Sequence, residues 1–235
     1  MATRSIENIL FHEGFGTRKE CRKLIFSGKV RCNETKITEC ETHCEEGSTV
    51  NVDGEVFTPV EILYIAYNKK TGEECSHKPS HYASVYENFP QRYLRRGLEC
   101  AGRLDVDTTG LLLFSDNGKF IHHIISKKRA LRKTYLVTLA ETLREEDRQL
   151  LISGIILNNE TEPVRALSLG AQDDKWLIEI DEGRYHVVKR MFGACANRVV
   201  ALQRVAIGDL TLGEIGEGQW VQLDNNDLEK LQWKI

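Results

Sequence analysis

Short apolar runs alternate with turns between residues 64 and 223, and this pattern limits the folds that the chain can adopt. Each run is four to seven residues long and rich in branched and aromatic side chains, which favours strands. The runs lie at 64–67, 111–114, 135–139, 176–180, 199–205 and 220–223. Helical periodicity is found mainly at 141–152, 185–194 and 225–233. Because strands and helices do not alternate regularly, we expect an α+β domain with a mostly antiparallel mixed sheet.

The first 59 residues have the pattern of a small α/β module. The segment Thr17-Arg18-Lys19-Glu20 has the form of a capping box and predicts the start of a helix. Gly28 can supply the left-handed residue that follows this helix, and Asp53-Gly54 between valines predicts a hairpin turn. We therefore expect two domains, a small module at residues 1–59 and a larger domain at residues 60–235.

Charge is divided sharply within this module. Residues 18–31 hold six basic side chains against the single acid Glu20, whereas residues 34–55 hold seven acids against Lys36. The net charge of −3 therefore does not exclude a nucleic-acid partner, because local patches bind phosphate. An ordinary solvated helix face is the alternative. The residues that we expect to bind RNA here are Arg18, Lys19, Arg22, Lys23 and Lys29.

The segment from Gly102 to Gly110 places a cation, two carboxylates and two hydroxyls between glycines, directly before an apolar run. A polar loop that runs into a buried strand can hold a carboxylate at the floor of a cleft. The residues alone leave three interpretations open: a turn that caps its own backbone, a calcium loop, and an enzyme site. Calcium fits poorly, because Asp116 stands where the EF-hand pattern has glutamate and no good helix precedes the loop.

Three segments in order resemble the motifs of the pseudouridine synthases that modify ribosomal RNA. The string Ala101–Leu113 is similar to the central motif, Lys133-Thr134-Tyr135 to the second, and Glu182–Phe192 to the third, except that Val187 replaces the usual glutamine. Residues 5–57 resemble the S-four-type RNA-binding module. The resemblance covers nearly the whole chain and implies an RNA isomerase that uses no cofactor and no metal.

The resemblance also implies roles for single residues. Asp105 would be the nucleophile or the base toward ribose, Tyr135 would stack on the target base or relay a proton, and Lys189 would stabilise the carboxylate. A cation is needed there because burial disfavours an ionised carboxylate. The target base must leave its helix or loop. Arg103 would hold the vacated position or a flanking phosphate, while Asp107 and Thr108 would brace the loop.

Further cations are expected to bind RNA outside the pocket. They are Lys127, Lys128, Arg129, Arg132, Lys133, Arg184 and Arg190.

Within the family, the module and the stretch 74–86 resemble the small-subunit branch, whose target is uridine 516 of 16S ribosomal RNA. We therefore expect 16S rRNA, or a partly assembled small subunit, as the partner. One alternative is a pseudouridine synthase for a 23S rRNA site. The other is a non-catalytic RNA-binding factor for ribosome assembly that kept the fold.

The remaining sequence features concern location and cysteine chemistry. No apolar run has the 18 or so residues of a membrane span, and the first residues lack a signal-peptide pattern. We expect a cytoplasmic monomer with no membrane partner. The seven cysteines form no paired framework, and Cys40, His43 and Cys44 lack a second ligand pair for zinc. Free thiols are the expected state.

Overall fold

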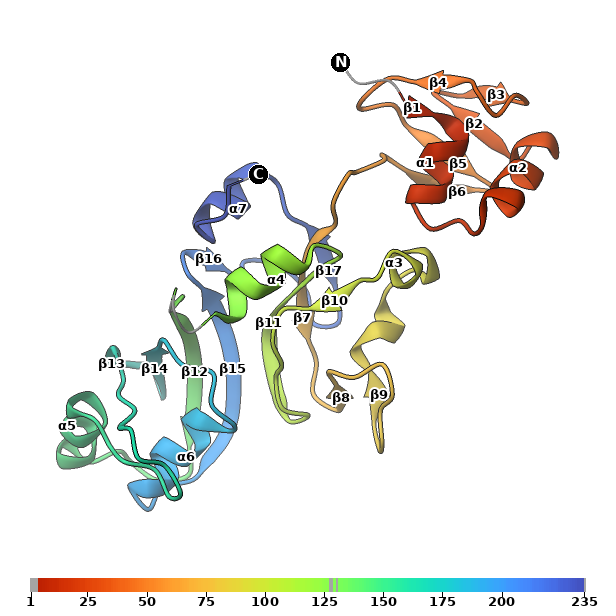
Figure 1. The fold of residues 1–235 in the computed structure, drawn as a ribbon. Helices are drawn as coiled ribbons and strands as arrows, with labels where there is room; N and C mark the ends of the chain where they lie inside the picture. Colours follow the sequence, from red (N-terminus) through yellow and green to blue (C-terminus); the bar gives the residue numbers. More distant parts are fainter. Residues whose placement is uncertain (1–3, 127–128, 130, 235) are drawn as a thin grey trace. The chain divides into compact units, whose positions relative to one another are not determined.

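A computed structural model of the chain describes residues 4–126, 129 and 131–234, and it divides into two compact units (Figure 1). The first unit runs to Leu63 and takes in Phe89–Glu99. The second unit consists of Tyr64–Asn88 and the residues from Cys100 onward. Residues 89–99 thus pack with the first unit although they follow the opening strand of the second.

The first unit packs two helices, α1 (Ile6–His12) and α2 (Arg18–Phe26), against a small antiparallel sheet. The sheet order is β3-β2-β5-β6. Its strands are β2 (Val30–Cys32), β3 (Thr35–Ile37), β5 (Val50–Val52) and β6 (Glu55–Phe57). Two short strands, β1 (Arg4–Ser5) and β4 (His43–Cys44), pair with each other. The shared core includes Ile6, Leu10, Ile25, Val30 and Val50.

Local sequence signals account for the boundaries of α2 and of the hairpin. The Thr17 hydroxyl accepts a hydrogen bond from the Glu20 amide, and the Glu20 carboxylate accepts one from the Thr17 amide, so the predicted capping box is present. Gly28 lies past the helix at φ +70°, as expected. Asp53 and Gly54 have φ of +53° and +96°, which confirms the turn between β5 and β6.

Buried ion pairs hold residues 89–99 in the first unit. Arg92 of α3 (Gln91–Arg95) donates from Nη1 to Glu13 at 2.7 Å and from Nε to Glu55 at 2.6 Å. Arg96 lies 3.0 Å from the other Glu13 oxygen. The Arg92 and Arg96 side chains are almost fully buried, as is that of Glu13, so these pairs have good geometry where their loss would leave an unpaired charge.

The second unit is built on a large mixed sheet of order β13-β14-β12-β15-β11-β7-β17. Its strands are β7 (Tyr64–Lys69), β11 (Thr108–Ser115), β12 (Lys133–Leu139), β13 (Ser168–Gln172), β14 (Lys175–Ile180), β15 (Val199–Ile207) and β17 (Trp220–Gln222), extended by β10 (Glu99–Cys100) beside β11 and β16 (Leu210–Thr211) beside β15. Of the neighbouring strand pairs in this order, only β11 and β15 run parallel to each other. The predicted α+β fold with a mostly antiparallel mixed sheet is confirmed.

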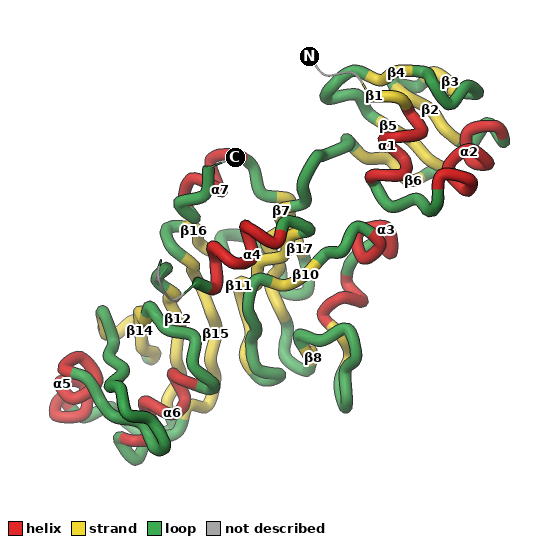
Figure 2. The backbone as a smooth tube through the Cα atoms, in the orientation of Figure 1, coloured by secondary structure: helices red, strands yellow, loops and turns green. Residues whose placement is uncertain are grey.

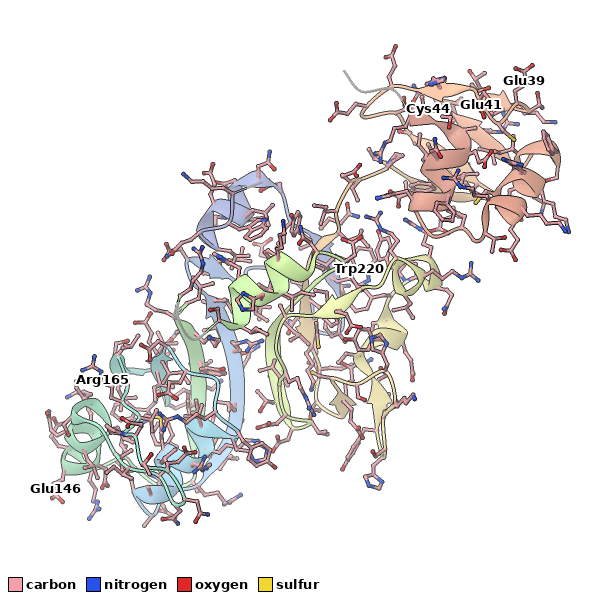
Figure 3. The ribbon with its side chains drawn as sticks, viewed as in Figure 1. Glu39, Glu41, Cys44, Glu146, Arg165 and Trp220 are labelled. Carbon is pink, nitrogen blue, oxygen red and sulfur yellow. The ribbon has the colours of Figure 1, made fainter. Side chains whose placement is uncertain are left out.

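The second unit is completed by helices and long loops. The helices are α4 (Gly118–Ile125), α5 (Glu145–Ser153), α6 (Val187–Ala194), α7 (Asn225–Lys230) and the 3-10 turn η1 (Val85–Asn88), and β8 (Glu73–Glu74) pairs with β9 (Ala83–Ser84). The connection from α5 to β13 is drawn as loop in Figure 2, and within it Ile155 and Val164 form an isolated antiparallel bridge. At the sheet edge Trp220, labelled in Figure 3, donates from Nε1 to the Asn88 carbonyl at 3.1 Å.

All six predicted strands and all three helices of the larger domain are present, within a few residues of their expected bounds. The helix α4 and the strand β13 were not predicted. All seven cysteines are free thiols, and five of them are buried. No helix in the described ranges is long and apolar enough to cross a membrane.

Candidate active site

The loop at residues 101–107 meets the ends of β11, β12 and β15 and the start of α6 around a cavity of about 190 Å³. The cavity lies within the second unit. Its lining combines apolar walls from Leu104, Ile125 and Leu202 with a group of polar side chains. The polar side chains are Arg103, Asp105, Thr108, Lys133, Tyr135, Asp181, Arg184, His186 and Arg204. A concave pocket with convergent polar groups is the usual form of a ligand site.

The Asp105 carboxylate has a separate partner on each oxygen. Lys189 Nζ donates to Oδ2 at 3.0 Å, and His186 Nε2 lies 3.1 Å from Oδ1. Lys189 also donates to Asp107 Oδ1 at 2.5 Å. The Asp105 side chain is 27% exposed and that of Asp107 is 72% exposed, so the two carboxylates differ in access to water. Of these two carboxylates, Asp105 is therefore the one that lines the pocket.

Charge pairing at this point outweighs burial. Burial acts to lower the pKa of Lys189, but hydrogen bonds and charge from Asp107 and Asp105 raise it above its ordinary value. Burial likewise acts to raise the pKa of Asp107, and the hydrogen bond and charge of Lys189 lower it instead. Lys189 is thus a protonated cation across the neutral pH range, and it donates to both Asp105 and Asp107.

His186 reaches Asp105 because of an unusual backbone conformation. The residue lies directly before α6 at φ +50°, in the left-handed region that non-glycine residues seldom adopt. Its ring stacks on Tyr185 with 3.6 Å between centroids, and Tyr185 is 75% exposed. We did not predict a role for His186 from the sequence. Its place within the third motif was the only signal, and the left-handed turn cannot be read from the residue type.

A buried lysine holds the loop that carries Asp105. Lys69 ends β7 with no exposed surface, and its Nζ donates to the carbonyls of Asp105 at 3.1 Å, Val106 at 3.3 Å and Thr108 at 3.0 Å. The Lys70 carbonyl lies 3.0 Å from the same Nζ, so the three N–H groups of the ammonium are shared among four carbonyls. Desolvation lowers the pKa of Lys69. The sequence analysis did not assign this contact, because a lysine followed by another lysine has the pattern of an exposed turn.

The expected brace residues act in different ways. The Thr108 amide donates to the Asp105 carbonyl at 3.1 Å and its carbonyl accepts from Lys69, so its backbone braces the loop. Its buried hydroxyl has no hydrogen-bond partner among the described residues. Asp107 contacts Lys189 through its side chain.

Tyr135 and Lys133 reach the pocket from β12. Tyr135 is 7% exposed and pairs in register with Arg204 of β15. Lys133 was expected outside the pocket, but it lines the pocket and donates to the Leu131 carbonyl at 3.0 Å. Burial, with a further effect from the charge of Arg204, lowers the pKa of Lys133 to about 8. The lysine side chain is therefore a cation that can lose its charge near neutral pH.

The remaining candidate cations of this unit have diverse surroundings. Arg103 is exposed at the pocket, Arg129 is exposed, and Arg132 lies 2.8 Å from Asp209. Arg190 donates to Glu160 at 2.9 Å, and Arg184 donates to the Glu162 carbonyl at 2.8 Å while also pairing with Glu182. These last two arginines hold the loop after α5, which leaves less of their charge for RNA. Lys127 and Lys128 lie outside the described residues.

Three cations of the basic segment at residues 18–31 form ion pairs within the first unit. Arg18 and Arg22 lie 3.3 and 2.9 Å from the carboxylate of Glu7, whose side chain is 5% exposed. Lys29 pairs with Asp53 at 2.6 Å. Lys19 and Lys23 are exposed.

An exposed aromatic ring stands beside these cations. Phe26 is 67% exposed and shares a shallow groove with Arg18, Lys19, Arg22 and Lys23. Aromatic rings next to cations can stack on bases, so this groove has the features of a nucleic-acid surface. The sequence analysis did not single out Phe26, because an apolar residue at the end of a helix has the pattern of a core position.

Known proteins are similar to this chain in sequence and in fold. The profile of the RNA pseudouridylate synthase family matches residues 63–194, and that of the S4 domain matches residues 4–50. The chain is 38% identical over 218 residues to the ribosomal small subunit pseudouridine synthase A of Haemophilus influenzae, covering 92% of this chain and 94% of that one. It is 33% identical to an uncharacterised RNA pseudouridine synthase of Aquifex aeolicus, with 92% and 91% covered.

A solved structure described as a pseudouridylate synthase superposes with a TM-score of 0.68 at 37% identity, covering 97% of this chain and 99% of that one. The chain therefore belongs to the RNA pseudouridylate synthase family and carries an amino-terminal S4 domain. The resemblance drawn from the three sequence motifs is confirmed at the level of the family.

Proposed function

We propose that the chain isomerises a uridine of small-subunit ribosomal RNA to pseudouridine, that the target is uridine 516 of 16S rRNA, and that Asp105 performs the chemistry. The observation that carries the proposal is the Asp105 carboxylate, enclosed in a pocket and held by Lys189 at 3.0 Å and His186 at 3.1 Å. The name of the Haemophilus influenzae relative, a ribosomal small subunit pseudouridine synthase, supports the choice of RNA.

The reaction requires one bond to break and one to form on the same nucleotide. The bond from ribose C1′ to uracil N1 breaks as the Asp105 carboxylate attacks the ribose or removes a proton from it. The detached base turns and C5 bonds to C1′, which breaks the bond from Asp105 to the ribose or, in the alternative, follows return of the proton from Asp105 to the ribose. The proton on C5 then leaves and N1 gains a proton, so atoms and charge balance. Lys189 donates to the Asp105 carboxylate at 3.0 Å and stabilises the negative charge with which it acts as nucleophile or base. Tyr135, on the pocket wall, stacks on the base or relays the C5 proton.

RNA binding is divided between the two units in this proposal. The exposed cations Lys19 and Lys23 beside Phe26 supply phosphate contacts and a stacking surface in the S4 domain. Arg103, at the rim of the pocket, holds the position that the target base leaves or a flanking phosphate. We propose the monomer as the active form and the cytoplasm as its location.

The test compares two neighbouring carboxylates. Asp105→Asn should abolish pseudouridine formation in a 16S rRNA substrate while RNA affinity stays nearly unchanged. The matched variant Asp107→Asn loses an exposed ion pair worth at most about 1 kcal/mol, so its rate should stay within about fivefold. Pseudouridine made by Asp105→Asn would refute the role of Asp105. Mapping pseudouridine in rRNA from cells that lack the protein tests the target. Pseudouridine that is still present at position 516 of 16S rRNA in these cells would refute it.

A further inference from the structure

The floor of the pocket carries two buried polar atoms that the reaction scheme above does not use. Among the residues that the structure describes, Nη2 of Arg204 and the hydroxyl of Thr108 have no hydrogen-bond partner. Arg204 is 3% exposed and Thr108 is 1% exposed, and both side chains line the pocket. A buried polar group without a partner costs about 1–3 kcal/mol, so such groups are uncommon unless a ligand completes them.

The sheet places these two side chains on one surface. Arg204 pairs with Tyr135 of β12 on one side and with Gly110 of β11 on the other, while Thr108 pairs with Leu202. Directly paired residues of neighbouring strands project to the same face, as do residues two apart along a strand. Arg204, Thr108 and Tyr135 therefore share the face that forms the pocket floor.

The position of Arg204 is fixed rather than adaptable. Its Nε donates to the Leu111 carbonyl at 2.7 Å, which orients the guanidinium. A Cβ at Gly110 would lie 2.2 Å from the Arg204 carbonyl, so the two strands approach as closely as only glycine permits. A guanidinium has five donors and no acceptor, and Lys133 adds a second cation nearby. The floor is therefore built to receive a hydrogen-bond acceptor.

We infer that Arg204 and Thr108 bind the uracil ring of the target nucleotide, with Arg204 donating to a ring carbonyl. The inference rests on the proposed function and adds the groups that recognise the base. Uracil offers carbonyl acceptors at O2 and O4, whereas cytosine has an amine in place of O4. An arginine donor facing that amine would stay unpaired, so the contact selects uracil over cytosine in the base orientation that presents O4 to Arg204.

The symmetry of the ring explains why a fixed donor suits an isomerase. Turning uracil about the line through N3 and C6 exchanges N1 with C5, as the reaction requires. The same turn exchanges O2 with O4. A donor at one place therefore keeps a carbonyl partner before and after the turn, and Arg204 can hold the detached base in both orientations.

The experiment is a double-mutant cycle between the protein and the base. Single-turnover rates are measured with RNA that carries uridine, 4-thiouridine or 2-thiouridine at the target position, since sulfur is a weaker acceptor than oxygen. Arg204→Met should lose about 10- to 100-fold in rate with uridine, because a bond to a charged donor is removed. It should also lose most of the wild-type penalty for sulfur at one or both positions. Arg204→Lys, which keeps a donor, should recover part of that penalty.

Each outcome decides between the claims. If both sulfur penalties are the same in the wild type and in Arg204→Met, the contact does not exist and the inference is overturned, while the proposed function stands on the uridine rates. If the wild type makes no pseudouridine in the RNA, the proposed function fails and the inference falls with it. Because Arg204→Met can fail to fold, its thermal unfolding is recorded. The isosteric Thr108→Val variant is used in a second cycle of the same design, and its single-turnover rate with uridine should fall about threefold to tenfold.

Discussion

Replacing Lys69 with methionine should destabilise the loop that carries Asp105. Methionine keeps an unbranched chain as far as Cε but lacks the ammonium group and donates no hydrogen bond, so the carbonyls of Asp105, Val106 and Thr108 lose their shared donor. At about 1 kcal/mol net for each of the three hydrogen bonds that an ammonium group can donate, the loss is about 3 kcal/mol. Relief from burying an ammonium group offsets part of it, which leaves about 2–3 kcal/mol.

Urea unfolding at constant m measures this change as a shift in the midpoint. The matched control is Lys70→Arg, since Lys70 is adjacent but 46% exposed and arginine keeps a cation beside the buried Glu73, which Lys70 contacts at 3.4 Å; its change should lie within about 0.5 kcal/mol. Because the loop carries Asp105, Lys69→Met should also lower kcat while leaving RNA affinity largely intact. Equal stability of the two variants, together with full activity of Lys69→Met, would refute the argument that Lys69 holds the loop.

Two further predictions concern pH and salt. The pKa of Lys133 is lowered to about 8, so the free enzyme loses this charge above pH 8. Because RNA is an anion and favours the charged lysine, binding above pH 8 takes up a proton. In binding titrations, wild-type affinity should therefore fall about tenfold per pH unit relative to that of Lys133→Met. A constant affinity ratio between pH 7 and 9.5 would contradict this. Replacing Lys19 and Lys23 with alanine should reduce the slope of log K against log salt by about 1.4 for two single-strand phosphate contacts, and an unchanged slope would assign both lysines to solvent.

Features that depend on local sequence were predictable. The capping box at Thr17, the turn at Asp53-Gly54 and the strands β12 and β15 arise from residues that are close in the chain. The helix α4 was missed because its sequence, Gly118 to Ile125, opens with glycine and contains two histidines. Its N-cap, Asn117, accepts hydrogen bonds from two amides and stabilises a start that periodicity alone does not indicate.

The site was predictable only as far as its motifs extend. Asp105, Tyr135 and Lys189 stand in motif order, and the structure brings Lys189 to Asp105 across 84 residues of sequence. The contacts of Lys69 with the loop and of Arg204 with Leu111 join strands that are far apart in the chain, and neither residue type differs from its neighbours in a way that predicts them. Burial decides both roles, and burial is a property of the assembled sheet.

The parallel pairing of β11 with β15 has a consequence for the order of synthesis. Thr108–Gly110 pairs with Leu202–Arg204, and β15 also separates β11 from β12. The middle of the sheet therefore cannot close until residue 207 has left the ribosome, although Asp105, Tyr135 and Lys189 have already emerged. A nascent chain can fold its S4 domain strands early, but it gains the pocket only near the end of translation. The ability to bind RNA thus precedes the ability to modify it during the production of each molecule.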